Sequence, residues 1–172
     1  NTPDGIPLYI NSWQDIYVHD AQIVTYSTGT YAGKQIAFCF GGLNGGFSNT
    51  GIWIVDITNK NNPEVLSIAN YGSASYCHQG WLSPDQRFLY VNDELDEDNY
   101  GFTTNMRIFN VEDLSNPFLA NTYTTGQNAT DHNLYTRDNL IFCANYESGL
   151  RILDASNPAF PIEIGYFDTY PE

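Results

Sequence analysis

A unit of sequence occurs three times in this chain of 172 residues, and every copy begins with a histidine: His19, His78 and His132. Each copy contains four short apolar runs separated by Gly, Asn, Asp, Ser or Pro. Two spacings are constant. The Asp or Asn that ends the third run precedes a Pro by seven residues (56 to 63, 110 to 117, 154 to 161), and the next histidine follows that Pro by fifteen (63 to 78, 117 to 132). Spacings that persist through a whole chain indicate a repeat protein.

The apolar runs are rich in Ile, Val, Phe and Tyr and end at turn residues, a pattern typical of short strands. Four strands per unit is typical of one blade of a β-propeller. No stretch of the sequence has the periodicity of an amphipathic helix. We therefore predict an all-β fold, a β-propeller with three complete four-stranded antiparallel blades at residues 19–71, 78–125 and 132–169.

Propellers close with about four to eight blades, so three blades predict a part of a larger propeller. Residues 7–13 begin with the apolar run Pro-Leu-Tyr-Ile, which predicts a single strand of a preceding blade. A free-standing stack of three blades is the alternative, but it would expose apolar blade faces to water. We therefore expect the partners of this segment to be further propeller blades, supplied by the same chain or by another.

The chain is strongly acidic, with 20 Asp and Glu, 6 Lys and Arg, and a net charge of −14. Such a surface repels phosphate groups, which argues against nucleic acid and anionic membranes as partners. No apolar run reaches the length of a membrane span, so we expect no membrane insertion by this segment. The acidity suits an extracellular or saline setting, or cation binding, and we expect an extracellular or cell-surface location.

The three cysteines, Cys39, Cys77 and Cys143, do not have the spacing of metal ligands. We expect them to be buried free thiols. The sequence contains neither the Gly-x-Ser-x-Gly motif of serine hydrolases nor a phosphate-binding loop, and we expect no organic cofactor. Asn128 begins the single glycosylation motif, which is a modification site only in a secreted eukaryotic protein.

The histidines begin the innermost strands of their blades, which predicts that they lie on one face of the disc, near its axis. The loops between second and third strands emerge on the same face and vary in length, as binding loops on a rigid scaffold often do. One hypothesis is that His19, His78 and His132 bind a transition metal, with Asp20 and Asp131 as further ligands or as partners that orient the imidazoles. The alternative is that each histidine hydrogen-bonds to a neighbouring blade.

A second candidate site is the acidic loop of blade two, residues 93–99, which carries five carboxylates. Hard cations such as calcium bind six to eight oxygen atoms, and this loop could supply several. It lacks the alternation and the sixth-position glycine of an EF-hand. A solvated acidic loop is the alternative. The candidate calcium ligands are Asp93, Glu94, Asp96, Glu97 and Asp98.

Several motifs together resemble a known family. The third run of the repeat reads Ile-Trp-Ile-Val-Asp at 52–56 and Leu-Arg-Ile-Leu-Asp at 150–154, and blade two departs from this pattern at Met106 and Asn110. The closer likeness covers essentially the whole chain and lies in residues 17–22, 78–82, 93–97, 131–133 and 166–171. On these residues the chain resembles the LVIVD-repeat β-propellers, specifically the choice-of-anchor B family. The resemblance implies a secreted or surface-attached propeller longer than 172 residues, of undefined biochemical activity, and it transfers no catalytic residues.

Two functions follow as hypotheses. The first is a non-catalytic extracellular or cell-surface module for binding or structural assembly, which the absent nucleophile motifs, the acidic surface and the resemblance favour. The alternative is a metalloenzyme that uses the axial histidines as an oxidase or hydrolase of small molecules. The metal content of the purified protein discriminates between them.

Overall fold

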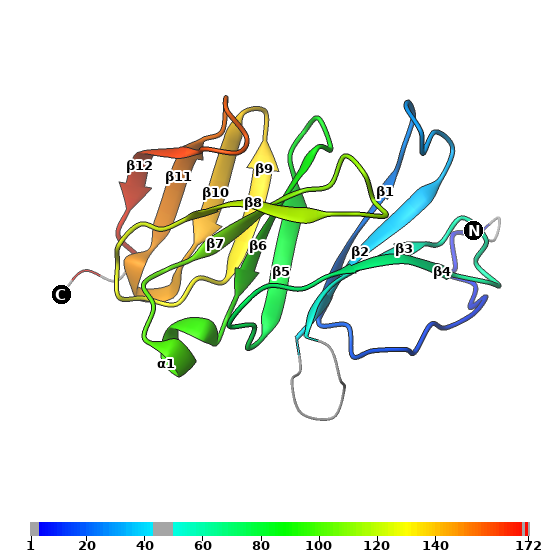
Figure 1. Ribbon diagram of the computed structural model, residues 1–172, viewed down its shortest axis with the longest axis horizontal. Coiled ribbons are helices and arrows are strands. Elements are labelled where there is room, and N and C mark those ends of the chain that lie inside the picture. Colours follow the sequence, from blue (N-terminus) through cyan, green and yellow to red (C-terminus); the bar gives the residue numbers. More distant parts are fainter. Residues whose placement is uncertain (1–3, 43–49, 170, 172) are drawn as a thin grey trace.

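The computed structural model describes residues 4–42, 50–169 and 171. In these residues three antiparallel sheets of four strands stand side by side (Figure 1), and each sheet is a meander in chain order. Blade one contains β1 (Asp20–Thr25), β2 (Gln35–Gly41), β3 (Gly51–Asp56) and β4 (Glu64–Ala69). Blade two contains β5 (Cys77–Leu82), β6 (Phe88–Asp93), β7 (Met106–Asn110) and β8 (Phe118–Tyr123). Blade three contains β9 (Asn133–Arg137), β10 (Leu140–Ala144), β11 (Leu150–Asp154) and β12 (Ile162–Phe167).

This architecture confirms the predicted all-β fold with four-stranded antiparallel blades. The first strands of the blades, β1, β5 and β9, are neighbours in space: β5 contacts both β1 and β9. Figure 1 shows β9 and β5 side by side in the middle of the molecule with β1 beyond β5, while β10, β11 and β12 lie successively farther from the middle. The residues that begin these inner strands are thereby brought to one place.

Two apolar layers hold the blades together, and β6 contributes to both because adjacent residues of a strand face opposite sides. Burying one such Phe, Ile or Leu side chain contributes roughly 1.5–3 kcal/mol. Between blades one and two lie Ile36, Phe38, Phe40, Ile52, Ile54, Leu89, Val91, Phe109 and Leu114. Between blades two and three lie Phe88, Tyr90, Met106, Ile108, Leu134, Ile141, Cys143 and Leu153.

The inner strands approach so closely that β5 needs a glycine at one position. A Cβ atom added at Gly80 would lie 2.5 Å from the carbonyl oxygen of Tyr90 and 2.7 Å from the ring of Phe40. Tyr90 belongs to the same blade and Phe40 to blade one, so Gly80 lets strand pairing and blade packing occur together. Position 80 therefore accommodates only glycine without a shift of the neighbouring atoms.

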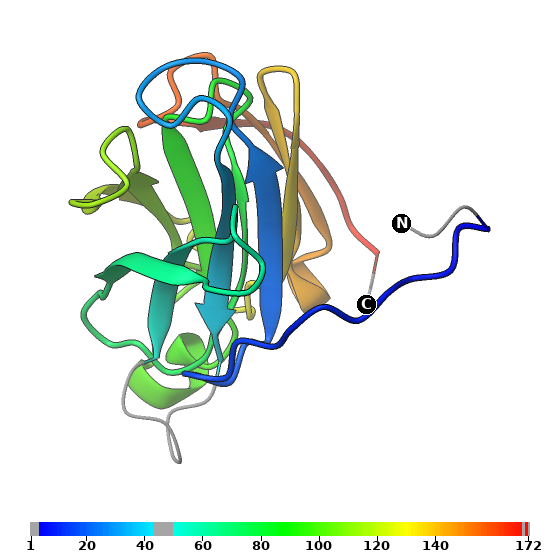
Figure 2. The same ribbon diagram turned by 90° about the vertical axis from the view of Figure 1, so that its right-hand side faces the viewer.

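The single strand expected within residues 7–13 is absent, because the structure assigns no strand to the described residues before Asp20. Figures 1 and 2 show this segment running outside the three sheets. The Asn11 side chain donates a hydrogen bond to the carbonyl of Asn61 (3.3 Å), and the Trp13 ring packs against Trp53 (5.9 Å between centroids). Strand formation needs a hydrogen-bonded neighbour, and no strand of the three sheets pairs with these residues.

Among the described residues, two short helical turns interrupt the strands. The acidic loop of blade two contains the helix α1 (Asp96–Tyr100), and blade three contains the 3₁₀ turn η1 (Tyr146–Ser148). Both are too short to produce a helical periodicity in the sequence. No helix in the described part of the chain has the length and apolar character needed to cross a membrane.

The three thiols are buried and unpaired, as expected from the sequence. Cys39, Cys77 and Cys143 are free cysteines in different blades. Burial raises the pKa of the Cys39 thiol to about 11 and that of the Cys77 thiol to about 12. Since a thiol reacts and binds metal as the thiolate, these groups serve as small apolar side chains.

Replacing Gly80 by Ala should lower the free energy of unfolding by about 1–3 kcal/mol, the range for overpacking a core. Denaturant unfolding followed by tryptophan fluorescence measures the effect. Gly72→Ala is the matched control, because no atom lies within 4 Å of a Cβ added there. A loss at Gly80 no larger than the loss at Gly72 would contradict the close approach of the inner strands.

Candidate metal centre

Antiparallel pairing brings two histidines and a glutamate to the same end of blades two and three. His78 lies near the start of β5, and Glu94 directly follows β6, the neighbouring antiparallel strand. A β-bulge shifts the register between Cys77 and Gln79, so His78 occupies the position at which the ladder is interrupted. Bulges change the direction in which a side chain points. His132 directly precedes β9, the inner strand that packs beside β5.

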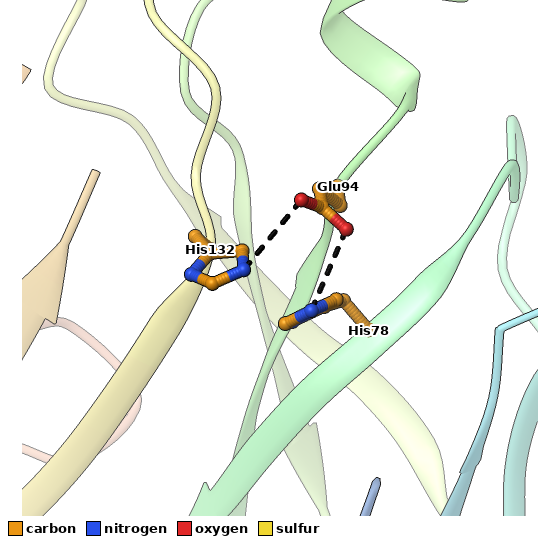
Figure 3. Close-up of side chains that lie close together, drawn as sticks. All are labelled: His78, Glu94 and His132. Atoms are coloured by element: carbon orange, nitrogen blue, oxygen red, sulfur yellow. Dashed lines mark ion pairs between the residues drawn. The ribbon is translucent and has the colours of Figure 1, made fainter. Parts of the chain in front are cut away.

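The ligand atoms of these three side chains face one another (Figure 3). Nε2 of His78 lies 3.4 Å from Oε2 of Glu94, and Nε2 of His132 lies 3.5 Å from Oε1 of Glu94. One ligand atom from each residue lies within 4.8 Å of the other two. Ligands at zinc–ligand distances of about 2.0–2.1 Å in a tetrahedron are about 3.3 Å apart. The two nitrogen–oxygen distances are close to this value, although each involves a different oxygen of Glu94.

Two histidines and one carboxylate form the donor set of catalytic zinc sites such as that of thermolysin, and also of non-haem iron sites. The side chain of His78 is 7% exposed, whereas those of Glu94 and His132 are 23% and 30% exposed. One side of the centre is thus accessible from solvent. A metal bound there would have room for water or a substrate atom as a further ligand.

The protonation of His78 favours metal binding. Burial lowers its pKa, the neighbouring His132 lowers it further, and the Glu94 carboxylate acts in the opposite direction. The net effect keeps the imidazole neutral over a wider pH range than usual. A neutral imidazole is the form that binds a metal ion.

Tyr146 contacts the same oxygen of Glu94 that faces His132. Its hydroxyl donates a hydrogen bond to Oε1 of Glu94, and its ring lies 4.9 Å from the ring of His132. The hydrogen bond to Glu94, together with burial, raises the pKa of Tyr146 to about 12. A protonated phenol thus orients the carboxylate toward the two imidazoles.

The three histidines lie together, as predicted, but His19 is outside the group of ligand atoms. The ring centroid of His78 is 4.4 Å from that of His19 and 4.2 Å from that of His132, so the rings form a column with His78 in the middle. Nδ1 of His19 is hydrogen-bonded to the hydroxyl of Tyr76 (2.8 Å). Glu94, which the sequence placed in the acidic loop, is the third member of the metal group.

Asp20 and Asp131 do not join the histidines. Oδ1 of Asp20 accepts a hydrogen bond from the backbone of Ala21 (2.7 Å). Asp131 is 1% exposed and accepts a hydrogen bond from the backbone of Asn105 in blade two (2.8 Å). Burial, and then the charge of Glu97, raise the pKa of Asp131 well above its usual range. Neither aspartate belongs to the metal group.

The acidic loop uses two carboxylates to join blade one to blade two. Asp93 accepts hydrogen bonds from the Tyr71 hydroxyl (2.8 Å) and from the backbone of Ser75 (2.8 Å) and Tyr76 (2.7 Å), all in the linker before β5. Asp96 forms a buried ion pair with Arg107, whose guanidinium lies 4.4 Å from the Tyr71 ring.

The remaining carboxylates of the loop point elsewhere. Oε1 of Glu97 accepts a hydrogen bond from the backbone of Asp131 (3.2 Å), and burial followed by the charge of Asp96 raises the pKa of Glu97 to about 7. Asp98 is exposed. The structure therefore distributes the five carboxylates over separate contacts instead of gathering them around one calcium ion. Three of the five carboxylate residues, Asp93, Asp96 and Glu97, are buried rather than solvated. Asn128 is exposed in the linker between β8 and β9.

Sequence reasoning missed the association of Glu94 with the histidines, and also the tyrosines around them. The sequence did contain part of the signal for Glu94. In an antiparallel blade, a residue that follows the second strand lies beside the start of the first strand. The bulge at His78 was not visible, since it depends on pairing register rather than on composition.

Comparison with known proteins agrees with the fold. The family model for the LVIVD repeat matches residues 133–169, which include all four strands of blade three. No curated protein matches the chain. The repeat match and the three four-stranded antiparallel sheets of the described residues are together consistent with a propeller-like repeat protein.

Proposed function

We propose that this protein is an extracellular or cell-surface propeller of the choice-of-anchor B type, which binds a divalent transition metal and acts as a non-catalytic binding or assembly module. The observation that carries the proposal is the geometry of His78, Glu94 and His132, which bring one ligand atom each to within 4.8 Å of the other two, the donor set of a catalytic zinc site.

An ion pair without a metal explains this geometry less well. A strong His–Glu ion pair requires a protonated imidazole, but the pKa of His78 is lowered by burial. Both carboxylate oxygens of Glu94 face imidazole nitrogens, which is an arrangement that one cation can bridge. A divalent ion would also offset part of the net charge of −14.

The proposed assembly role rests on exposed apolar side chains at the outer strand of blade three. On the outermost strand of blade three, Ile162, Ile164, Tyr166 and Phe167 are each more than half exposed. An exposed apolar surface of this kind typically contacts another protein surface. We propose that further propeller blades, from the same chain or another, cover it. The acidic composition supports the extracellular location and argues against nucleic acid as a partner.

A metalloenzyme is the second candidate function. Three protein ligands and a solvent-accessible side leave a coordination position for water or substrate, which is typical of catalytic rather than structural zinc sites. A metal-bound water could then act in hydrolysis, or a redox metal could act in oxidation of a small molecule. Turnover that requires the bound metal would favour this function over the module.

Zinc binding should depend on the three residues of the metal group. We expect the chelator-treated protein to bind one Zn²⁺ per chain, and His132→Ala or Glu94→Gln to weaken binding by more than about 100-fold, because each removes a ligand. Isothermal titration calorimetry measures the affinity, and elemental analysis measures the metal retained after purification.

His19→Ala is the matched control for this experiment, since it removes a histidine of the same column that is outside the ligand group. We expect its zinc affinity to change by less than about tenfold. An equal loss of affinity in His19→Ala and His132→Ala would contradict the assignment of ligands.

Zinc affinity should fall as the pH is lowered from about 7.5 to about 5.5, because protons compete with the metal for the imidazole nitrogens. The pKa of His78 is lowered from 6.5, so protonation of this ligand occurs only below that value. Calorimetric titrations across this range test the expectation. An affinity independent of pH would show that the histidines are not ligands.

A further inference from the structure

The junction between blades two and three buries carboxylate oxygens that have no hydrogen-bond partner. Asp131 is 1% exposed; its Oδ2 accepts from the backbone of Asn105, but its Oδ1 has no partner among the described residues. Glu97 is 7% exposed; its Oε1 accepts from the backbone of Asp131, but its Oε2 has no partner there either. A buried carboxylate oxygen without a partner is strongly destabilising, so the charged form of these two groups requires a positive charge nearby.

The charges at this junction do not balance. The carboxyl groups of Asp96, Glu97 and Asp131 lie close enough to interact electrostatically. Arg107 forms an ion pair with Asp96, and its charge also acts on Asp131, so a single basic side chain faces three carboxyl groups. An uncompensated pair of buried carboxylates calls for a positive charge beside it.

A cleft connects Glu97 with solvent. Its volume is about 530 Å³, and its lining includes Glu97, Asp98 and Glu147 together with the polar residues Asn128 and Thr130. No Lys or Arg lines it. Carboxylate, amide and hydroxyl oxygens without a basic neighbour are the ligands that calcium prefers.

We propose that a hard divalent cation of the calcium class binds between Glu97 and Asp131 and reaches this site through the cleft. Asp96, Glu97 and Asp131 do not form a compact group of three ligand atoms like that of the histidine centre. The cation therefore contacts two carboxylates and completes its six to eight oxygen ligands with neutral oxygens of the cleft and water. The site goes beyond the proposed function and is independent of the transition-metal centre.

The consequence is a calcium-dependent connection between blades. Glu97 belongs to α1 of blade two, whereas Asp131 belongs to the linker that enters blade three. A cation between them joins these segments and replaces the missing hydrogen bonds. Because it binds the folded state, calcium should stabilise the protein by mass action.

The test uses the whole chain after treatment with a chelator. We expect about 1 mM Ca²⁺, the range for extracellular calcium modules, to raise the thermal unfolding midpoint by several degrees. Glu97→Gln and Asp131→Asn should each weaken calcium binding at least tenfold in calorimetric titration. These substitutions keep the size of the side chain, and Asp131→Asn retains an acceptor for the Asn105 backbone.

Two controls separate this site from the others. Glu64→Gln removes an exposed carboxylate of blade one and should leave calcium binding unchanged. His78→Ala should lose zinc binding while calcium binding stays, so failure of one site is distinguishable from failure of the other. If wild-type protein shows neither calcium binding nor a shift in its unfolding midpoint, the proposal is overturned, and a shared proton satisfies the two carboxyl groups instead. Calcium binding that survives Glu97→Gln and Asp131→Asn overturns it as well.

Discussion

The close packing of the inner strands is the constraint on which the rest of the structure depends. Strand β5 lies between β1 and β9, and Gly80 permits this approach because no side chain intrudes between Tyr90 and Phe40. The histidines at the starts of neighbouring inner strands therefore lie close together. The ring centroid of His78 is 4.4 Å from that of His19 and 4.2 Å from that of His132. The candidate metal centre follows from this packing and from the antiparallel return of β6, which places Glu94 beside His78.

The carboxylates of the acidic loop make different kinds of contact. Asp93 accepts hydrogen bonds from the linker between blades one and two, and Asp96 neutralises the buried Arg107. Glu94 faces two imidazoles, and Glu97 lies against Asp131 at the next junction. Four of the five carboxylates of this loop thus separate into structural contacts and candidate ligands, because the chain turns at residues 94–95, between β6 and α1.

The repeat spacing was sufficient to predict strands, blades and the common face of the histidines, because these features follow from periodicity and antiparallel order. The strand expected within residues 7–13 does not form in the structure. An apolar run indicates a preference for the strand conformation, but a strand also needs a neighbouring strand with which to pair. The grouping of Glu94 with His78 and His132 depends on a bulge between Cys77 and Gln79, and the sequence pattern does not specify such a register shift. The division of the acidic loop depends on tertiary partners such as Tyr71, which lies in the linker between blades one and two.

The central claim is that His78, Glu94 and His132 hold one transition-metal ion at the end of the inner strands where the histidines lie. The most direct measurement is a crystal structure of the zinc-soaked protein with anomalous data collected on both sides of the zinc absorption edge. The account predicts one strong anomalous peak about 2.0–2.2 Å from Nε2 of His78, from Nε2 of His132 and from a carboxylate oxygen of Glu94. A peak that instead lies beside His19 or α1, or the absence of any peak at the three side chains, would contradict it.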